Sequence, residues 1–219
     1  MFNLLHVVNL SDAAGDADAI AARLAEIGMT LPGVVTNAAG KTLPRSLNGE
    51  HLMWRISFAT ELDHWAALSS ATWRSEIDPL LDPASGVSFD RVSYRPSLSD
   101  ASAGRQKEGI WRCLTLSVDA GTSAAEIIQF EKDTALMPAH VPAIRNWALC
   151  KVVASTGRRN WTHVWEQEFD DVAGLEGPYM LDPIHWGLVD GWFDPECPQR
   201  IVDPFLIHAA FAIKQAVIA

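Results

Sequence analysis

The sequence is poor in basic residues. Lys and Arg number 17 against 27 Asp and Glu, which gives a formal net charge of −10 and an isoelectric point near 5.0. A protein that binds nucleic acid needs a stripe of Lys and Arg to neutralise the phosphate backbone. No such stripe is visible, so we expect no nucleic-acid partner.

Long apolar runs are also missing. No segment stays apolar for about 18 residues, the length that a membrane-spanning helix needs. The first twenty residues, MFNLLHVVNLSDAAGDADAI, lack the basic segment and the long apolar run of a signal peptide. We therefore expect a cytoplasmic protein without a membrane partner.

Cysteine and the common cofactor motifs are scarce. The three cysteines, Cys113, Cys150 and Cys197, are widely and irregularly spaced, which fits neither a disulfide framework nor a zinc site. They are expected to be free thiols in a reducing compartment. HExxH, CxxC, GxGxxG, GxSxG and a Gly-rich phosphate loop are all absent. We expect no metal and no cofactor.

What is present is a repeated pattern of strands and helices. Hydrophobic periodicity predicts a strand, a helix, two strands, a helical stretch and a strand at 2–10, 16–27, 33–37, 50–60, 61–81 and 87–95. The same order returns at 110–118, 123–137, 144–153, 160–169, 174–193 and 205–213. The order βαββαβ is the ferredoxin-like pattern.

The chain therefore divides into a first repeat at 1–96, a polar linker at 97–109 and a second repeat at 110–219. A ferredoxin-like unit leaves one face of its sheet bare, and two such faces can close against each other. We predict an α+β fold in which tandem ferredoxin-like repeats form a dimeric-type α+β barrel within one chain. Whether this unit forms a further homodimer stays open.

The two repeats can be compared position by position. HLMWRISF aligns with THVWEQEF, so that Trp54 lies over Trp165, and LLHVVNL aligns with IWRCLTL, which sets His6 over Arg112. His163 and Gln167 then stand where the first repeat has apolar residues. An unpaired polar group on an apolar face costs roughly 1–3 kcal/mol. We therefore expect a site on the inner faces, mainly in the second repeat.

The stretch GPYMLDPIHWG carries the residues best suited to catalysis. Asp182 and Pro183 form a helix-start signature, which sets His185 in a first helical turn. The helix dipole there favours the neutral form of His185, and we expect the Asp182 carboxylate to offset this effect in part. A neutral histidine can act as a general base, and Tyr179 can donate a hydrogen bond to a developing oxyanion. The alternative is that both residues only pack the helix, with their polar tips at the surface.

Tryptophan is abundant, and six of the nine lie in the second half of the chain. They either fill the core or, together with the histidines, accept a flat aromatic ligand. Glu166 and Glu168 fall on the opposite face of their strand, where we expect them to be solvated or at an interface.

The run THVWEQEF, followed by Tyr179-x-x-Asp182-Pro183-x-His185, resembles the stress-responsive A/B barrel (Dabb) family of dimeric α+β barrels. The family pattern there is a strand with T-H and then Y-x-x-H-P-x-H, so Asp182 departs from it. The resemblance is good over residues 140–213 and faint over 1–96.

The resemblance implies chemistry of the kind performed by plant polyketide cyclases of this family, in which a histidine is the base and a tyrosine orients the substrate without a cofactor. His185 and Tyr179 match these residues, His163 matches the strand histidine, and His6 matches a first-strand histidine. The acidic residue that steadies the base has no obvious counterpart, although His208 lies in that strand.

We therefore predict a cofactor-independent lyase, cyclase or isomerase acting on an aromatic or β-keto small molecule. The predicted catalytic residues are His185, Tyr179 and His163, and the predicted substrate-binding residues are His6, Arg112, Trp165, Gln167, Trp186 and His208. Two alternatives stay open: a non-catalytic small-molecule-binding barrel of the stress-response type, and a monooxygenase that works without a cofactor or with haem.

Overall fold

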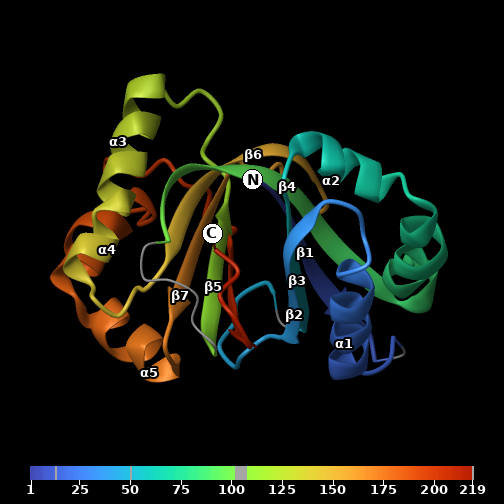
Figure 1. The fold of residues 1–219 in the computed structure, drawn as a ribbon. Helices are drawn as coiled ribbons and strands as arrows, with labels where there is room; N and C mark the ends of the chain where they lie inside the picture. Colours follow the sequence, from blue (N-terminus) through green and yellow to red (C-terminus); the bar gives the residue numbers. More distant parts are fainter. Residues whose placement is uncertain (13, 50, 102–107, 219) are drawn as a thin grey trace.

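Eight antiparallel strands form one curved sheet with the order β2-β3-β1-β4-β6-β7-β5-β8. The computed structural model describes residues 1–12, 14–49, 51–101 and 108–218. The sheet bends into a nearly closed barrel, with α1 and α2 on one side of it and α3, α4 and α5 on the other (Figure 1). The predicted fold class is confirmed.

Each half of the chain follows the predicted order. The first half contains β1 (Phe2–Leu10), α1 (Ala17–Gly28), β2 (Val34–Lys41), β3 (Leu52–Phe58), α2 (Glu61–Leu68), the short turns η1 (Trp73–Ile77), η2 (Asp78–Leu81) and η3 (Pro83–Ser85), and β4 (Val87–Asp100). The second half contains β5 (Gly109–Leu116), α3 (Ala124–Ala135), α4 (Met137–His140), β6 (Trp147–Thr156), β7 (His163–Phe169), α5 (Val172–Gly174), the short turns η4 (Leu175–Tyr179), η5 (His185–Val189) and η6 (Asp190–Trp192), and β8 (Ile207–Ile213).

Local sequence fixes where the helices begin. Thr60 and Ser123 each accept a hydrogen bond from the backbone N–H three residues later, and Asp63 and Glu126 return a bond to the capping residue. These reciprocal bonds satisfy donors that a helix start leaves free. The predicted helical stretch at 61–81 divides into α2 and the short turns η1 and η2, and the stretch at 174–193 consists of short turns rather than one continuous helix.

The connection between the repeats begins later in the chain than predicted. We expected a linker from 97 to 109, but β4 continues through Asp100 and pairs with β6 as far as Asp100↔Trp147. Pairing with β6 keeps this polar segment extended, a tertiary effect that composition does not reveal. Residues 102–107 of the predicted linker lie outside the described residues.

The barrel is closed along two unequal seams. β4 and β6 join the halves along a long ladder. At the other seam, β2 and β8 are bridged by the segment after β2, where Leu43 N–H donates to Ala210 C=O at 2.8 Å and Leu47 exchanges two bonds with His208 at 2.7 and 3.0 Å. The first repeat is therefore held against β8 of the second.

The two faces of the sheet have different partners. Residues such as Val7, Cys113 and Val164 point into the barrel and pack together, whereas Trp165 and Phe169 point outward and pack against α3 and the helical turns. We expected Trp165, Gln167 and their neighbours on the inner faces of the barrel, and this is wrong. A barrel filled by its own side chains leaves room for a ligand only outside, under the helices.

The strand register corrects one predicted correspondence. In β3, Trp54 lies opposite His6 of β1, but its counterpart Trp165 in β7 lies opposite Leu114 of β5. The counterpart of His6 is therefore Leu114, and Arg112 corresponds to Leu4. A shift of two residues keeps each side chain on the same face, which is why the sequence pattern did not reveal it.

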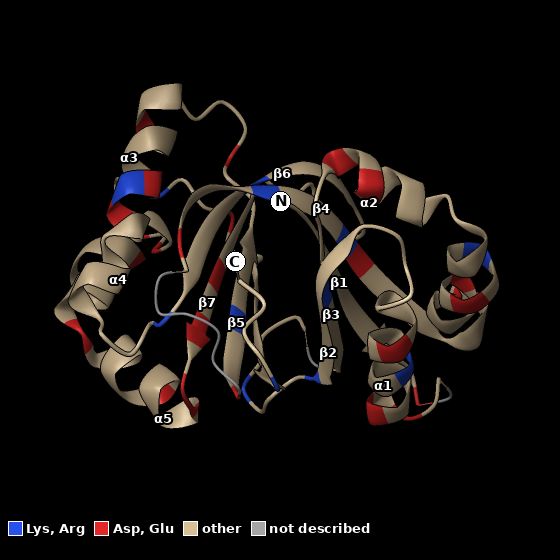
Figure 2. Ribbon diagram, viewed as in Figure 1, with Lys and Arg blue, Asp and Glu red and all other residues tan. Residues whose placement is uncertain are grey.

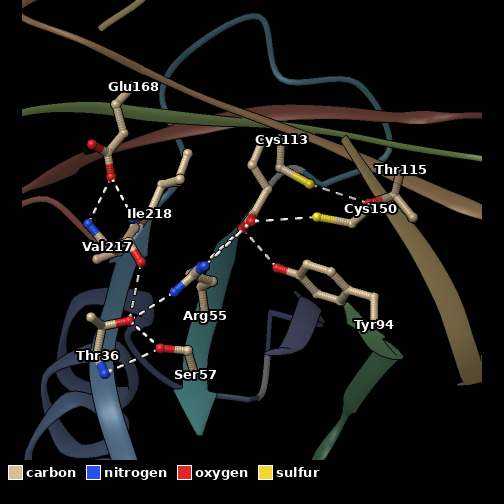
Figure 3. Close-up of polar contacts among 11 residues, drawn as sticks. Thr36, Arg55, Ser57, Tyr94, Cys113, Thr115, Cys150, Glu168, Val217 and Ile218 are labelled. Atoms are coloured by element: carbon tan, nitrogen blue, oxygen red, sulfur yellow. Dashed lines mark hydrogen bonds and ion pairs between the residues drawn. The ribbon is translucent and has the colours of Figure 1, made fainter. Parts of the chain in front are cut away.

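An ion pair lies at the centre of the barrel (Figure 3). Arg55 of β3 is 1% exposed and donates through Nε to Glu166 Oε1 of β7 at 2.8 Å and through Nη2 to Oε2 at 3.3 Å. Tyr94 of β4 donates its hydroxyl to the same carboxylate at 2.7 Å. Burial alone would lower the pKa of Arg55, but Glu166 raises the pKa above its ordinary value.

The neighbouring Glu168 is equally buried. Its carboxylate accepts from the backbone N–H groups of Val217 and Ile218 at 2.6 and 2.9 Å and from Asn146 Nδ2 at 2.7 Å. We expected Glu166 and Glu168 to be either solvated or at an interface, and solvation is wrong. Glu166 lies at the contact between the two repeats, and Glu168 lies at the contact with the C-terminal segment. Hydrogen bonds and the Arg55 charge offset the cost of this burial.

A second charged contact joins the halves at the turn between β6 and β7. Asp90 of β4 is buried and accepts from the backbone N and the Nε of Arg158 at 2.7 and 2.6 Å and from Trp161 Nε1 at 3.1 Å. Gly157 has φ +127°, and a Cβ there would overlap the Asp90 carboxylate. Only glycine fits this turn.

The surface agrees with the acidic composition. Figure 2 shows acidic positions on α1, α2 and α3, and basic positions scattered without a stripe over the part of the chain that it colours. No helix among the described residues is long and apolar enough to cross a membrane.

We expect Arg55→Met to lower the free energy of unfolding by about 3–5 kcal/mol, because the Glu166 charge would stay buried without its partner. The double variant Arg55→Met/Glu166→Leu should recover much of that loss. Urea denaturation measures both. Arg23→Met, which removes two exposed pairs, with Glu26 and Glu76, is the control and should leave stability almost unchanged. A single Arg55 variant as stable as this control would contradict the assigned role.

Candidate functional site

A cavity of about 210 Å³ lies between the outward face of the second-repeat sheet and its helical cover. β5, β7 and β8 form its floor, and α3 together with the turns η4 and η5 form its walls. The apolar part of the lining includes Leu114, Leu116, Phe130, Met137, Val189 and Leu206. Five of the predicted residues also line it: Arg112, Trp165, Tyr179, His185 and His208.

The break between η4 and η5 orients the two central side chains. The Asp182 carboxylate accepts from Ile184 N–H at 2.9 Å, so Asp182 starts the second helical stretch as predicted. Tyr179 closes the first stretch and His185 follows the break, and their ring centroids are 4.9 Å apart. Tyr179 is 2% exposed, so it is not a surface residue with a polar tip.

The carboxylate beside His185 is not the predicted one. We expected Asp182 to offset the helix dipole, but Asp190 Oδ2 lies 3.7 Å from His185 Nδ1. Burial lowers the pKa of His185, Asp190 partly offsets this, and Arg112 lowers the pKa further. The net shift is downward, so His185 is neutral at pH 7 and its free nitrogen can accept a proton.

Arg112 is the charged residue of the cavity floor. It is 3% exposed, donates through Nε to His208 Nε2 at 3.0 Å and through Nη1 to Gln167 Oε1 at 2.6 Å, and its Cζ lies 5.0 Å from the centre of the Tyr179 ring. The adjacent Arg112 charge, with burial, lowers the pKa of His208 to about 3. Gln167 does not line the cavity, but its side-chain oxygen holds the Arg112 guanidinium in place.

Two buried donors surround the Tyr179 hydroxyl. Trp165 Nε1 and Gln167 Nε2 have no hydrogen-bond partner among the residues that the structure describes. Burial raises the pKa of Tyr179, while Arg112, Trp165 and Gln167 partly offset this. The phenol is therefore protonated at neutral pH and can donate a hydrogen bond.

His163 does not line the cavity. Its Nε2 lies 3.2 Å from Glu131 Oε1 of α3, which also pairs with Lys151 at 2.9 Å, and its Nδ1 lies 2.9 Å from Thr162 Oγ1. These contacts fasten α3 to the sheet, and burial lowers the pKa of His163 although Glu131 opposes the shift.

Two other predicted residues lie away from the cavity. His6 is buried in the first repeat, stacks on Trp54 and accepts from Arg91 Nε at 2.8 Å. Trp186 is 62% exposed, because the helical turn that carries it directs it outward. The structure thus gathers six of the nine predicted residues, Gln167 included, and separates His163, His6 and Trp186 from them.

A second hollow, of about 680 Å³, lies next to the cavity, and the first repeat forms one side of it. Residues 43–46, from the segment that closes the barrel, form one side, and Val172, Leu175 and Glu176 form the other. Met180 and His208 line both this hollow and the cavity. Sequence reasoning missed this contribution and missed Asp190, although the His185–Asp190 spacing of five matches one π-helical turn.

Metal ligands do not gather in the described part of the chain. No group of three or more His, Cys, Asp and Glu residues there could hold a metal ion. The cavity offers instead the Arg112 cation, two neutral imidazoles, a phenol, the Asp190 carboxylate and apolar walls.

We expect His208→Gln to weaken the response of stability to acid. The unfolded chain protonates His208 near pH 6.5, whereas the folded protein does so only near pH 3. The contribution of His208 to folding stability is therefore fully present above pH 6.5 and is lost as the pH falls toward 3. Between pH 7 and 4.5 the variant should lose up to about 3 kcal/mol less than the wild type. Urea denaturation at both pH values tests this, with the exposed His140→Gln as control; identical pH dependence in all three proteins would refute the assignment.

The fold recurs in solved structures of similar length. An anthrone oxidase-like protein superposes with a TM-score of 0.68 at 10% identity, covering 98% of this chain and 92% of its own. A candidate monooxygenase from Lactobacillus acidophilus NCFM gives 0.58 at 13% identity, covering 98% and 94%. A mutant chlorite dismutase from Candidatus Nitrospira defluvii gives 0.54 at 9% identity, covering 95% and 90%. Identities this low establish the fold alone.

Sequence comparison gives a more specific result for the second repeat. No curated protein sequence matches the chain. The family model of the stress responsive A/B barrel domain matches residues 110–204, which carry every residue that lines the cavity except Leu206 and His208. The second repeat, which carries most of the cavity, is therefore similar to the stress responsive A/B barrel domain.

Proposed function

We propose that the chain is an enzyme that removes a proton from a small ring-bearing or β-keto substrate in the second-repeat cavity. The observation that carries this proposal is the placement of a neutral, largely buried His185 beside the protonated Tyr179 and the cation of Arg112. A base, a hydrogen-bond donor and a fixed positive charge around one small space suit a reaction that creates an oxyanion.

In the proposed reaction His185 accepts the proton from a carbon or oxygen acid. The electrons left behind form an enolate or phenolate, and the Tyr179 hydroxyl donates to its oxygen. The apolar walls exclude water, which strengthens both interactions. Return of the proton to another atom would complete an isomerisation, and bond cleavage or ring closure would complete a lyase or cyclase reaction. His163 lies outside the cavity and has no part in this scheme.

A monooxygenase is the second candidate. The whole-chain likeness to an anthrone oxidase-like protein and to a candidate monooxygenase supports it at the level of the fold. A cofactor-independent oxygenation would start with the same deprotonation by His185, because an enolate or phenolate reacts with dioxygen where its neutral parent does not. The two candidates therefore share their first step and differ in the requirement for oxygen.

We expect His185→Gln to lower turnover at least about 100-fold and Tyr179→Phe about tenfold, as usual for loss of a general base and of one oxyanion donor. A panel of phenolic and β-keto aromatic compounds, followed by mass spectrometry, identifies the substrate on wild-type protein. Each variant is then assayed with that substrate. His140→Gln, an exposed histidine at the end of α4, is the matched control and should turn over normally.

The same assay without oxygen separates the candidates. Full turnover under nitrogen would support the lyase, cyclase or isomerase, and loss of turnover with oxygen uptake in air would support the monooxygenase. Unchanged activity of His185→Gln would refute both. Binding of panel compounds without any product would favour a non-catalytic small-molecule-binding barrel.

A further inference from the structure

The protein contains two deeply buried arginines with opposite surroundings. Arg55, 1% exposed, is matched by the Glu166 carboxylate at 2.8 Å. Arg112, 3% exposed, donates only to the neutral acceptors His208 and Gln167 in the described part of the chain, and no carboxylate there lies within 4.0 Å of it. A buried charge without a counterion is costly. Arg55 has such a counterion, and Arg112 has none among the described residues.

The groups around Arg112 do not compensate its charge. Its neighbours His208 and His185 have lowered pKa values and are neutral at pH 7. Asp190 is the one carboxylate among the described residues that line the cavity, but its side chain is 48% exposed and lies beside His185. The floor of the cavity therefore keeps a net positive charge.

Unused hydrogen-bond donors accompany this charge. Arg112 Nη2 makes no hydrogen bond with the described residues, and Trp165 Nε1 and Gln167 Nε2, at 1% and 0% exposure, are also without partners there. Buried donors in folded proteins are nearly always satisfied. Arg112 and Trp165 both line the cavity, so the free guanidinium nitrogen and the buried indole N–H form a place for an acceptor that carries negative charge.

We propose that this cavity binds a planar, ring-bearing carboxylate, with the carboxylate paired to Arg112 and the ring held between the apolar walls. The inference rests on the proposed function, since it names the class of substrate for the same site. An apolar cavity of about 150 Å³ accommodates benzene, so the volume of about 210 Å³ is enough for one ring and a carboxylate. Arginine is suited to this group because its planar fork matches the two carboxylate oxygens.

Benzoate, benzamide and acetate are the probes. Benzoate carries the ring and the charge at pH 7, benzamide keeps the shape without the charge, and acetate keeps the charge without the ring. We expect benzoate to bind the wild-type protein at least tenfold more tightly than either of the others. Titration followed by ¹⁵N NMR also reports the site, because the Trp165 indole N–H signal, assigned with Trp165→Phe, should shift with benzoate.

Three variants test the assignment to Arg112. Arg112→Gln removes the charge and should abolish the preference for benzoate over benzamide. Gln167→Glu places a carboxylate where Gln167 Oε1 already accepts from Arg112 at 2.6 Å, so it should abolish the same preference while the protein stays folded. Arg23→Gln, on the exposed face of α1, should bind as the wild type does.

The results separate this inference from the proposed function because binding is measured without turnover. Binding of benzoate through Arg112 in a protein that converts no substrate would uphold the inference and refute the function. The inference is overturned if benzamide binds as well as benzoate, if acetate binds equally well and marks a general anion site, if no probe binds, or if the preference for benzoate survives in both Arg112→Gln and Gln167→Glu.

Discussion

The ion pair between Arg55 and Glu166 is the constraint on which the rest of the structure depends. It crosses the barrel from β3 of the first repeat to β7 of the second, and Tyr94 of β4 completes it. Because a buried charge without its partner is costly, the pair fixes which strands of the two repeats face each other across the barrel. The interior of the barrel is filled by side chains that hold the repeats together, and the proposed site lies on the outer face of the sheet.

The outward faces of the two repeats differ: that of the first is filled by side chains, and that of the second keeps a cavity. At the positions of Arg112 and Gln167 the first repeat has Leu4 and Ile56, and its outward face is filled by Trp54 and Trp73 stacked 5.4 Å apart. The second repeat instead keeps a cavity. It still depends on the first, since the segment after β2 is bonded to β8 beside His208 and lines the adjoining hollow. The first repeat thus shapes the site without supplying its polar groups.

The sequence predicted the fold and much of the candidate site because both follow from periodicity. Alternation in THVWEQEF correctly placed Trp165 and Gln167 on one face, and the Asp182-Pro183 signal correctly placed the helix start before His185. What it missed depends on strand pairing between the repeats and on one unusual local helix geometry. Which face turns inward is decided by the pairing of β4 with β6, and the carboxylate near His185 is set by a π-helical turn that no local propensity announces.

The cover of the cavity differs in kind from the barrel beneath it. Between Val172 and Trp192 the chain forms only short turns, interrupted at Asp182 and containing Pro178, whereas every strand of the floor is bonded on both sides or, like β8, on one side and at a bridge. Few backbone bonds need to break for such a cover to lift. A ligand of the kind proposed here would then enter through a local opening of this segment, which breaks none of the strand pairing in the barrel.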